Sequence, residues 1–563
     1  MRHKVRGSLW VRLLAVSLAL LLVMLAVPES GALAPSSEAP TLRLVGRDPE
    51  RAPVVEVDGS GGFVAPKGDY LQLPPRSDAR TRAAGLLGTH DGRQGPGAIC
   101  GVRDQGETST CAVHASLTNI CSTMASAGEG EYQFDADDVM RRIEQITGSM
   151  GANAASVGHV ASTVGLRETT CTGLMLESTA LQACPCIKTV LGTRLLGDEN
   201  PASVEALKSW VLEYGSVIVS MDSGTTGSAW HTAFHDYDGS YVLHHGGAPD
   251  GPDTHAAVVI GWDDELPHAG GNGAWIAQNS WGTDWGGACG WGTERGYFYI
   301  SYQSVGFGGY PAVFDRWQDY DPTGSICYND EGGYAGESVG YDGIRAPWGA
   351  ARLIPAQDGV VQAVELWAVD EMTDVDIRIY DIFDANGFSN LLGQVDDVHL
   401  TTPGYHHVPL TATVPGALGL DALTTAAGSI PVVNGEDLYV VVKFGCANEG
   451  LMPVDSYYAA SPNQSFASAH GIGGTWTDLA DYGYGDIGIR LRIRAAEEPT
   501  STPTHTPAPT ATPTRTATPT ATTWATATST RQPTVTMTPD GTITPSTTPS
   551  LVGGVLYLPL LIR

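Results

Sequence analysis

Cys111, His255 and Asn279 are the residues whose types and surroundings point most directly to chemistry. A thiol attacks a carbonyl carbon only as the thiolate, so it needs a neighbour that takes its proton, usually an imidazole. The imidazole needs a third group that holds its ring in position. An apolar run with helical spacing begins at Cys111, and a helix N-terminus stabilises a thiolate. These residues therefore predict a cysteine nucleophile that attacks an acyl group.

The elements expected to position these residues form an α+β domain with a helical lobe and a β lobe. One helix is expected to begin near Cys111. Short β-branched or aromatic runs predict strands, with His255 at the mouth of one strand and Asn279 just after another. Further helices are predicted over residues 131–146 and 201–214, and the strands are expected near residues 217, 256, 274 and 297.

The segment around Asn279 resembles the papain-like cysteine peptidases. It reads Asn-Ser-Trp-Gly-Thr-Asp-Trp-Gly from residue 279, and Gly-Tyr-Phe-Tyr-Ile follows from residue 296. The resemblance covers roughly residues 73–302. It implies a two-lobed fold in which Cys111 is the nucleophile, His255 its base and Asn279 the residue that orients the base.

The same resemblance assigns two supporting residues. Trp281 would shield the hydrogen bond between asparagine and histidine. Gln105, six residues before Cys111, would supply the side-chain donor of the oxyanion hole, and the backbone N–H of Cys111 would be the second donor. The expected activity is hydrolysis of peptide bonds in a protein or peptide substrate, through an acyl-enzyme. Transfer of the acyl group to an amine is a further alternative.

The segment around Cys111 departs from the family pattern. Thr108 stands where the family usually has a cysteine, and Ala112 stands where it usually has a tryptophan. Neither position takes part in the chemistry, so the reaction can survive both changes. The alternative is a catalytically inactive papain-like homologue that acts as a stalked surface-binding or adhesion protein.

Charge and composition narrow the partners. The formal net charge is −30, without clusters of lysine and arginine, which argues against nucleic acid as a partner. No cofactor and no metal are expected, because Cys184-Pro-Cys186 has no matching second pair at zinc-site spacing. Nine cysteines are an odd number for an exported protein, which favours one free thiol and up to four disulfides of unknown connectivity. A disulfide between Cys327 and Cys446 is expected because both lie in the same β-rich region.

The N-terminus predicts export. Residues 1–34 have a basic start, a short apolar run and small residues, as a secretory signal peptide does, and an uncleaved membrane anchor is the alternative. Residues 35–82 are expected to be a short pro-segment or linker without a blocking helix. The peptidase domain is placed at residues 83–315. The expected location is extracellular, with or without retention at the cell surface.

The remainder of the chain predicts an all-β sandwich at residues 316–497, followed by a disordered stalk rich in threonine and proline at residues 498–550. The sandwich resembles the lectin-like domain that follows a papain-like domain in some microbial secreted proteins. Its expected role is binding of a carbohydrate or cell-surface ligand, with a spacer as the alternative, since a fold does not fix a ligand. The apolar tail at residues 551–563 is either a sorting signal or a docking strand.

Overall fold

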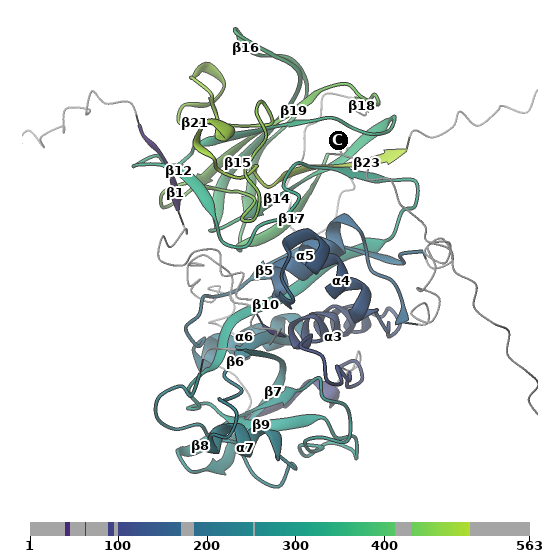
Figure 1. Ribbon diagram of the computed structural model, residues 1–563, viewed down its shortest axis with the longest axis vertical. Coiled ribbons are helices and arrows are strands. Elements are labelled where there is room, and N and C mark those ends of the chain that lie inside the picture. Colours follow the sequence, from purple (N-terminus) through teal and green to yellow (C-terminus); the bar gives the residue numbers. More distant parts are fainter. Residues whose placement is uncertain are drawn as a thin grey trace, which may run out of the picture. The chain divides into compact units, whose positions relative to one another are not determined.

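The computed structural model describes seven stretches of the chain: residues 40–45, 62–63, 88–94, 99–169, 185–251, 254–410 and 430–495. The predicted signal peptide, stalk and C-terminal tail lie outside these described residues. The helices are α3 (Cys111–Ser126), α4 (Ala136–Thr147), α5 (Ala154–Thr163), α6 (Val204–Tyr214) and α7 (Ala229–His235), with 3₁₀ turns η1 (Gly92–Gln94), η4 (Gly471–Gly473) and η5 (Leu479–Tyr482) (Figure 1).

The strands fall into an N-terminal set and a C-terminal set. The first set is β1 (Leu42–Val45), β2 (Gly62–Phe63), β3 (Thr89–Asp91), β4 (Gly151–Ala152), β5 (Lys188–Leu195), β6 (Val217–Met221), β7 (His255–His268), β8 (Gly271–Gln278), β9 (Tyr297–Ser301) and β10 (Phe307–Asp319). The second set, called the β domain below, is β11 (Ser325–Cys327), β12 (Ser338–Tyr341), β13 (Trp348–Leu353), β14 (Gly359–Ala368), β15 (Met372–Asp384), β16 (Gly387–Leu400), β17 (Gly404–Pro409), β18 (Pro431–Val432), β19 (Leu438–Cys446), β20 (Leu451–Pro453), β21 (Ser465–Ser468), β22 (Thr477–Asp478) and β23 (Ile489–Ala495).

Local sequence signals explain where the helices begin and end. The side chain of Asp135 accepts a hydrogen bond from the backbone N–H of Asp138 and caps α4, and Gly148 ends that helix in the left-handed conformation. The hydroxyl of Ser203 caps α6 in the same way. Both helices therefore start a few residues after the predicted positions, because the cap residue fixes the first turn. The helix predicted at Cys111 is confirmed.

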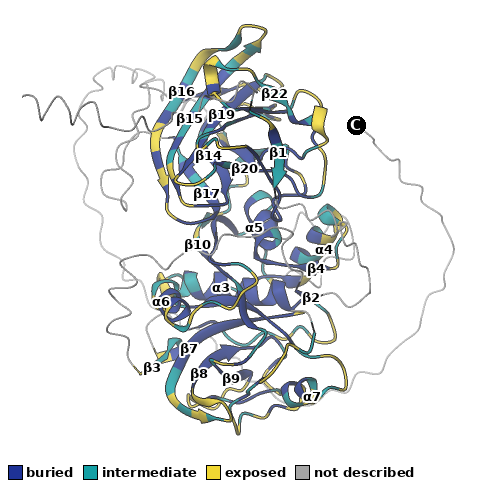
Figure 2. Ribbon diagram, turned by 90° about the vertical axis from the view of Figure 1, so that its left-hand side faces the viewer, coloured by how far each residue is buried: buried dark blue, intermediate teal, exposed yellow. Residues whose placement is uncertain are grey.

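Helix α3 is the centre of the helical lobe and is buried along most of its length (Figure 2). It packs against β7 and β10, so the two lobes meet along it. Val113 and Leu117 of α3 are fully buried with Phe134 in the core of the helical lobe. A second core, which includes Trp262 and Phe298, fills the β lobe. The predicted two-lobed α+β architecture is confirmed.

One sheet continues from the β lobe into the β domain. Its strands are ordered β11-β23-β14-β17-β5-β10-β6-β7-β8-β9, and β17 pairs with β5 through Gly404 and Tyr405. A second sheet, β16-β15-β19-β13-β21-β22, packs its inner face on the core that includes Val440 and Ile489. The all-β sandwich is therefore confirmed, and it shares a sheet with the preceding region, which the sequence did not predict.

The cysteines differ from the prediction in two respects. One free thiol was expected, whereas five cysteines among the described residues are free: Cys111, Cys186, Cys289, Cys327 and Cys446. Cys327 and Cys446 are both free thiols, so the predicted disulfide between them is wrong. Cys327 lies on β11, next to β23, whereas Cys446 ends β19 in the other sheet. Their shared domain therefore did not make them neighbours. A disulfide joins Cys100 to Cys121 instead.

Among the described residues, no helix combines the length and the apolar character needed to cross a membrane.

Candidate active site

Cys111 is the first residue of α3, and its thiol is buried at 2% exposure. The thiol contacts the backbone oxygen of Thr254 at 3.8 Å. Thr254 directly precedes His255, the first residue of β7. The fold thus brings the nucleophile of the helical lobe against the start of the strand that carries the predicted base.

His255 and Asn279 form a hydrogen bond of 2.8 Å between Nε2 and Oδ1. The same Oδ1 accepts the backbone N–H of Ser280 at 2.8 Å, which identifies it as the amide oxygen. An amide oxygen only accepts, so Nε2 of His255 must carry the proton. Nδ1 is therefore the unprotonated nitrogen of the neutral ring and is available as a base.

Trp281 covers this pair from one side. Its ring lies 5.2 Å from the ring of His255 and 4.9 Å from that of Phe234 in α7. Phe234 also contacts the imidazole of His255 edge-on, at 5.7 Å. Aromatic rings on these sides exclude water from the hydrogen bond between His255 and Asn279 and lock the imidazole in place.

Three hydrogen bonds fix Gln105, two of them to Ser280, the neighbour of Asn279. Its backbone N–H donates to the oxygen of Ser280 at 2.8 Å, and its Oε1 accepts from the Ser280 hydroxyl at 2.6 Å. Its Nε2 donates to the oxygen of Thr108 at 2.6 Å. A primary amide has two N–H donors, so one remains unbonded to any described residue and is free for an oxyanion.

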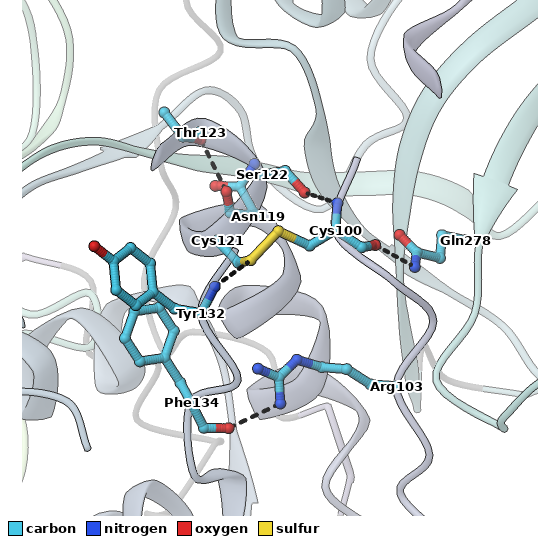
Figure 3. Close-up of a disulfide and its surroundings, with 9 residues drawn as sticks. All are labelled: Cys100, Arg103, Asn119, Cys121, Ser122, Thr123, Tyr132, Phe134 and Gln278. Carbon is cyan, nitrogen blue, oxygen red and sulfur yellow. Dashed lines mark hydrogen bonds between the residues drawn. A yellow bond between two sulfur atoms is a disulfide. The ribbon is translucent and has the colours of Figure 1, made fainter. Parts of the chain in front are cut away.

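The disulfide fixes the segment that leads to Gln105 (Figure 3). Cys100 is bonded to Cys121 of α3, and its backbone N–H donates to the hydroxyl of Ser122 at 3.0 Å. Its oxygen accepts from Nε2 of Gln278, the neighbour of Asn279, at 3.0 Å. This one residue therefore ties the segment before Gln105 to both α3 and β8.

A short strand from the N-terminal segment lies at the site. β2 pairs in parallel with β4, and the backbone N–H of Phe63 donates to the oxygen of Thr254 at 3.2 Å. The Phe63 side chain is 8% exposed and its ring lies 5.6 Å from that of Tyr310. The sequence did not predict this contact. Residues 62–63 thus occupy the same backbone oxygen that the Cys111 thiol contacts.

Burial dominates the electrostatics of the covered site. It raises the pKa of the Cys111 thiol to about 11, while the backbone N–H groups of Ala256, Ala112 and Phe63 act to lower it. Burial also lowers the pKa of His255 to about 4, opposed by the hydrogen bond to Asn279. Burial thus favours the neutral forms of both groups, whereas the backbone N–H groups around the sulfur, that of Phe63 included, favour the thiolate.

A cluster of potential metal ligands lies elsewhere, in the β domain. The described residues contain one cluster of three potential ligands, Asp374, Asp376 and Asp397, on β15 and β16 of the β domain. Lys443 forms an ion pair with Asp374 and another with Asp376, which offsets part of their negative charge.

The part of the chain that holds these residues is similar to one family of known proteins. Residues 88–307 match the family model described as papain family cysteine protease. Over these residues, which include Cys111, His255 and Asn279, the chain is therefore similar to papain family cysteine proteases.

Two individual similarities support this assignment. The crystal structure of the cysteine protease and lectin-like domains of Cwp84, a surface-layer-associated protein of Clostridium difficile, aligns with a TM-score of 0.56 at 14% identity, over 78% of this chain and 94% of that one. This likeness extends the shared fold to the β domain. A cathepsin B-like cysteine proteinase 6 of Caenorhabditis elegans is 32% identical over 99 residues, which is 17% of this chain and 20% of the nematode protein. The match thus spans a fifth of that relative's length.

Proposed function

We propose that this protein is a secreted cysteine endopeptidase that hydrolyses peptide bonds through Cys111, His255 and Asn279. The observation that carries the proposal is the hydrogen-bond pattern at Asn279, which places the proton of His255 on Nε2 and leaves Nδ1 as a base. The papain-family match over residues 88–307 and the position of Cys111 at a helix N-terminus support it.

The reaction follows from these groups. Nδ1 of His255 takes the thiol proton, and the Cys111 thiolate attacks the peptide carbonyl carbon. The free N–H of Gln105 and the backbone N–H of Cys111 stabilise the oxyanion. The imidazolium then protonates the leaving amine as the C–N bond breaks, and a thioester remains. Water, deprotonated by His255, hydrolyses the thioester and restores the thiol.

We further propose that the chain is synthesised in a latent form. The backbone N–H of Phe63 donates to the oxygen of Thr254, which the Cys111 thiol also contacts, and burial of the site disfavours the thiolate. Access of substrate to Cys111 then requires displacement or cleavage of the segment that includes β2. This extends the expectation of a non-helical pro-segment, since the described part of that segment blocks as a strand.

The finer assignments on location and partners remain part of the proposal. Export would depend on residues 1–34, and the peptidase and β domains would divide near residues 315–316, within β10. The β domain would bind a carbohydrate or cell-surface ligand. The lectin-like fold of the Cwp84 neighbour, described as surface-layer associated, supports this role.

The test is product analysis with the purified chain after trimming of its N-terminal segment. Hydrolysis of a protein substrate, abolished by Cys111→Ala and by His255→Ala, would support the endopeptidase. Incorporation of an added amine in place of water would favour acyl transfer. A folded, trimmed chain that yields neither product would favour the inactive binding protein.

A further inference from the structure

Two histidines on α7 differ from the other histidines in the described part of the chain. His231 and His235 are one helical turn apart, and their ring centroids lie 4.0 Å from each other. His231 is half-buried and His235 is exposed. Neither ring donates to or accepts from a described residue. The pair therefore offers two unoccupied imidazoles on one helix face.

We infer that His231 and His235 form a binding site for a divalent transition-metal ion of the zinc or copper class. Neutral imidazole is a preferred ligand of these ions, and histidines at positions i and i+4 of a helix are a recurring bidentate arrangement. Zinc–nitrogen bonds of about 2.0–2.1 Å in a tetrahedral site place the two nitrogens about 3.3 Å apart. Rings with centroids 4.0 Å apart reach that spacing by side-chain rotation alone. Water would complete the coordination.

The backbone that carries the two histidines is fixed, because the hydroxyl of Ser228 caps α7 at the N–H of His231 and Trp285 donates to the oxygen of His235 at 3.0 Å. Only the side chains have to move when the ion binds.

A second histidine pair shows what a structural pair looks like. The rings of His244 and His268 lie 5.1 Å apart. Nδ1 of His244 shares a hydrogen bond with the hydroxyl of Ser301, and Nδ1 of His268 accepts the N–H of Gly270. One nitrogen of each ring is already used, unlike in the pair on α7, so His268 provides a matched control.

The position of the site gives the ion a consequence. The ring of His235 lies 4.7 Å from that of Trp281, whose other contacts include the ring of His255 at 5.2 Å. A bound cation adds positive charge beside the imidazole that must become imidazolium during catalysis. Zinc would therefore inhibit the peptidase reversibly. This part of the inference rests on the proposed function, whereas metal binding does not.

The test is calorimetric titration of zinc chloride into the full-length chain carrying Cys111→Ala, which removes the thiolate as a competing ligand. We expect one binding event that weakens at least about tenfold when His231→Gln is added, since even outer-sphere partners of a metal contribute about 10–100-fold in affinity. His268→Gln should leave the event unchanged. No binding, or equal binding with His231→Gln, would overturn the site.

A second measurement separates inhibition from binding. In the trimmed chain with Cys111 intact, His231→Gln should leave the activity without metal unchanged and should raise the zinc concentration needed for inhibition. Identical zinc inhibition of both chains would overturn the inhibitory role. Thermal unfolding without metal verifies that the substitution at this accessible position leaves the fold intact. Absence of any peptidase activity would contradict the proposed function but not the calorimetric result.

Discussion

At the scale of the residue, the proposed reaction needs the Cys111 thiol as a thiolate, whereas burial of the site favours the neutral thiol. The thiol of Cys111 and the imidazole of His255 are both buried, and burial moves their pKa values in the directions that disfavour the ion pair. The N–H groups at the start of α3 act in the other direction. Which of the two prevails depends on solvent access to the thiol, which β2 limits under the latency proposed above.

Gln105 provides a direct test of the oxyanion hole. Gln105→Ala removes the side-chain donor and should lower kcat/KM about 10²–10³-fold, the usual effect of losing one such donor. Steady-state kinetics on a peptide substrate would measure the change. Glu107→Ala, at an exposed position two residues away, should change little. Equal activity of Gln105→Ala and the unaltered chain would contradict the assigned role.

The sequence singles out these residues as candidates because local patterns surround them. The tautomer of His255 could not be predicted, since it depends on Ser280 and Asn279 sharing one oxygen. The residues that the sequence analysis missed lack such patterns. Phe63 reaches the site through a tertiary contact with Thr254, nearly 200 positions along the chain, and no periodicity signals it.

At the scale of the element, β2 is the proposed cover of the site. Burying a phenylalanine side chain stabilises a structure by about 1.5–3 kcal/mol. Phe63→Asp removes that contribution, so the fraction of uncleaved chains with an open site should rise about 10–100-fold. The rate at which a thiol reagent modifies Cys111 in the uncleaved chain measures this fraction.

The control for that experiment is Leu44→Ala, which alters β1 in the same N-terminal segment but far along the chain from β2. It should leave the reactivity of Cys111 nearly unchanged. If Phe63→Asp also reacts at the rate of the unaltered chain, β2 does not protect the thiol.

The element boundaries indicate what patterns can and cannot predict. Helix α3 begins at the predicted residue because the apolar spacing begins there. Helix α5 was not predicted, because its ten residues are small and buried on most sides, so no amphipathic stripe marks it. Papain-like peptidases usually have a cysteine where this chain has Thr108, and here a disulfide joins Cys100 to Cys121 instead. Only the packing of the segment before Gln105 against α3 reveals it.

At the scale of the whole molecule, two buried arginines of the β domain form ion pairs within that domain and hydrogen bonds to the helical lobe. Arg490 of β23 donates to both oxygens of Asp330 and to Nδ1 of His159 in α5, the latter at 2.8 Å. Arg492 pairs with Glu365 and also donates to the oxygen of Ser162. Charged groups that are removed from water require partners, and α5 supplies part of the hydrogen bonding of both arginines.

Arg490→Met tests this dependence. It leaves the carboxylate of Asp330 buried without its partner and should lower the free energy of unfolding by about 3–5 kcal/mol. Denaturant unfolding measures the change, with Arg494→Met near the exposed end of the same strand as control. Adding Asp330→Asn should recover part of the loss. A single unfolding transition is expected; independent unfolding of the two regions would contradict their interdependence.

A carboxyl group in the β domain predicts a pH dependence of stability. Burial raises the pKa of Asp486 to about 7, and neighbouring Asp330 and Asp455 raise it further, against the hydrogen bond from Ser465. A raised folded-state pKa means that the folded chain holds the proton more tightly than the unfolded chain. The protonated Asp486 contributes its full stabilisation of the folded state below pH about 4, and this contribution is lost as the pH rises towards about 7.

Asp486→Asn should therefore increase the free energy of unfolding at pH 8 by roughly 1–4 kcal/mol relative to the unaltered chain, since one pKa unit corresponds to about 1.4 kcal/mol. At pH 4 the two chains should differ little. Urea unfolding at both values measures this, with Asp481→Asn as an exposed control. A difference that is the same at both pH values would exclude titration of Asp486 as its cause.

Cys111 is expected to become a preorganised nucleophile once the segment that includes β2 is removed. The most direct measurement is labelling of the trimmed chain with an epoxide inhibitor of papain-like enzymes, followed by intact mass and peptide mapping. One adduct on Cys111 is predicted, absent from Cys111→Ala and from the heat-denatured chain. A folded, trimmed and reduced chain that takes no label at Cys111 would contradict the account.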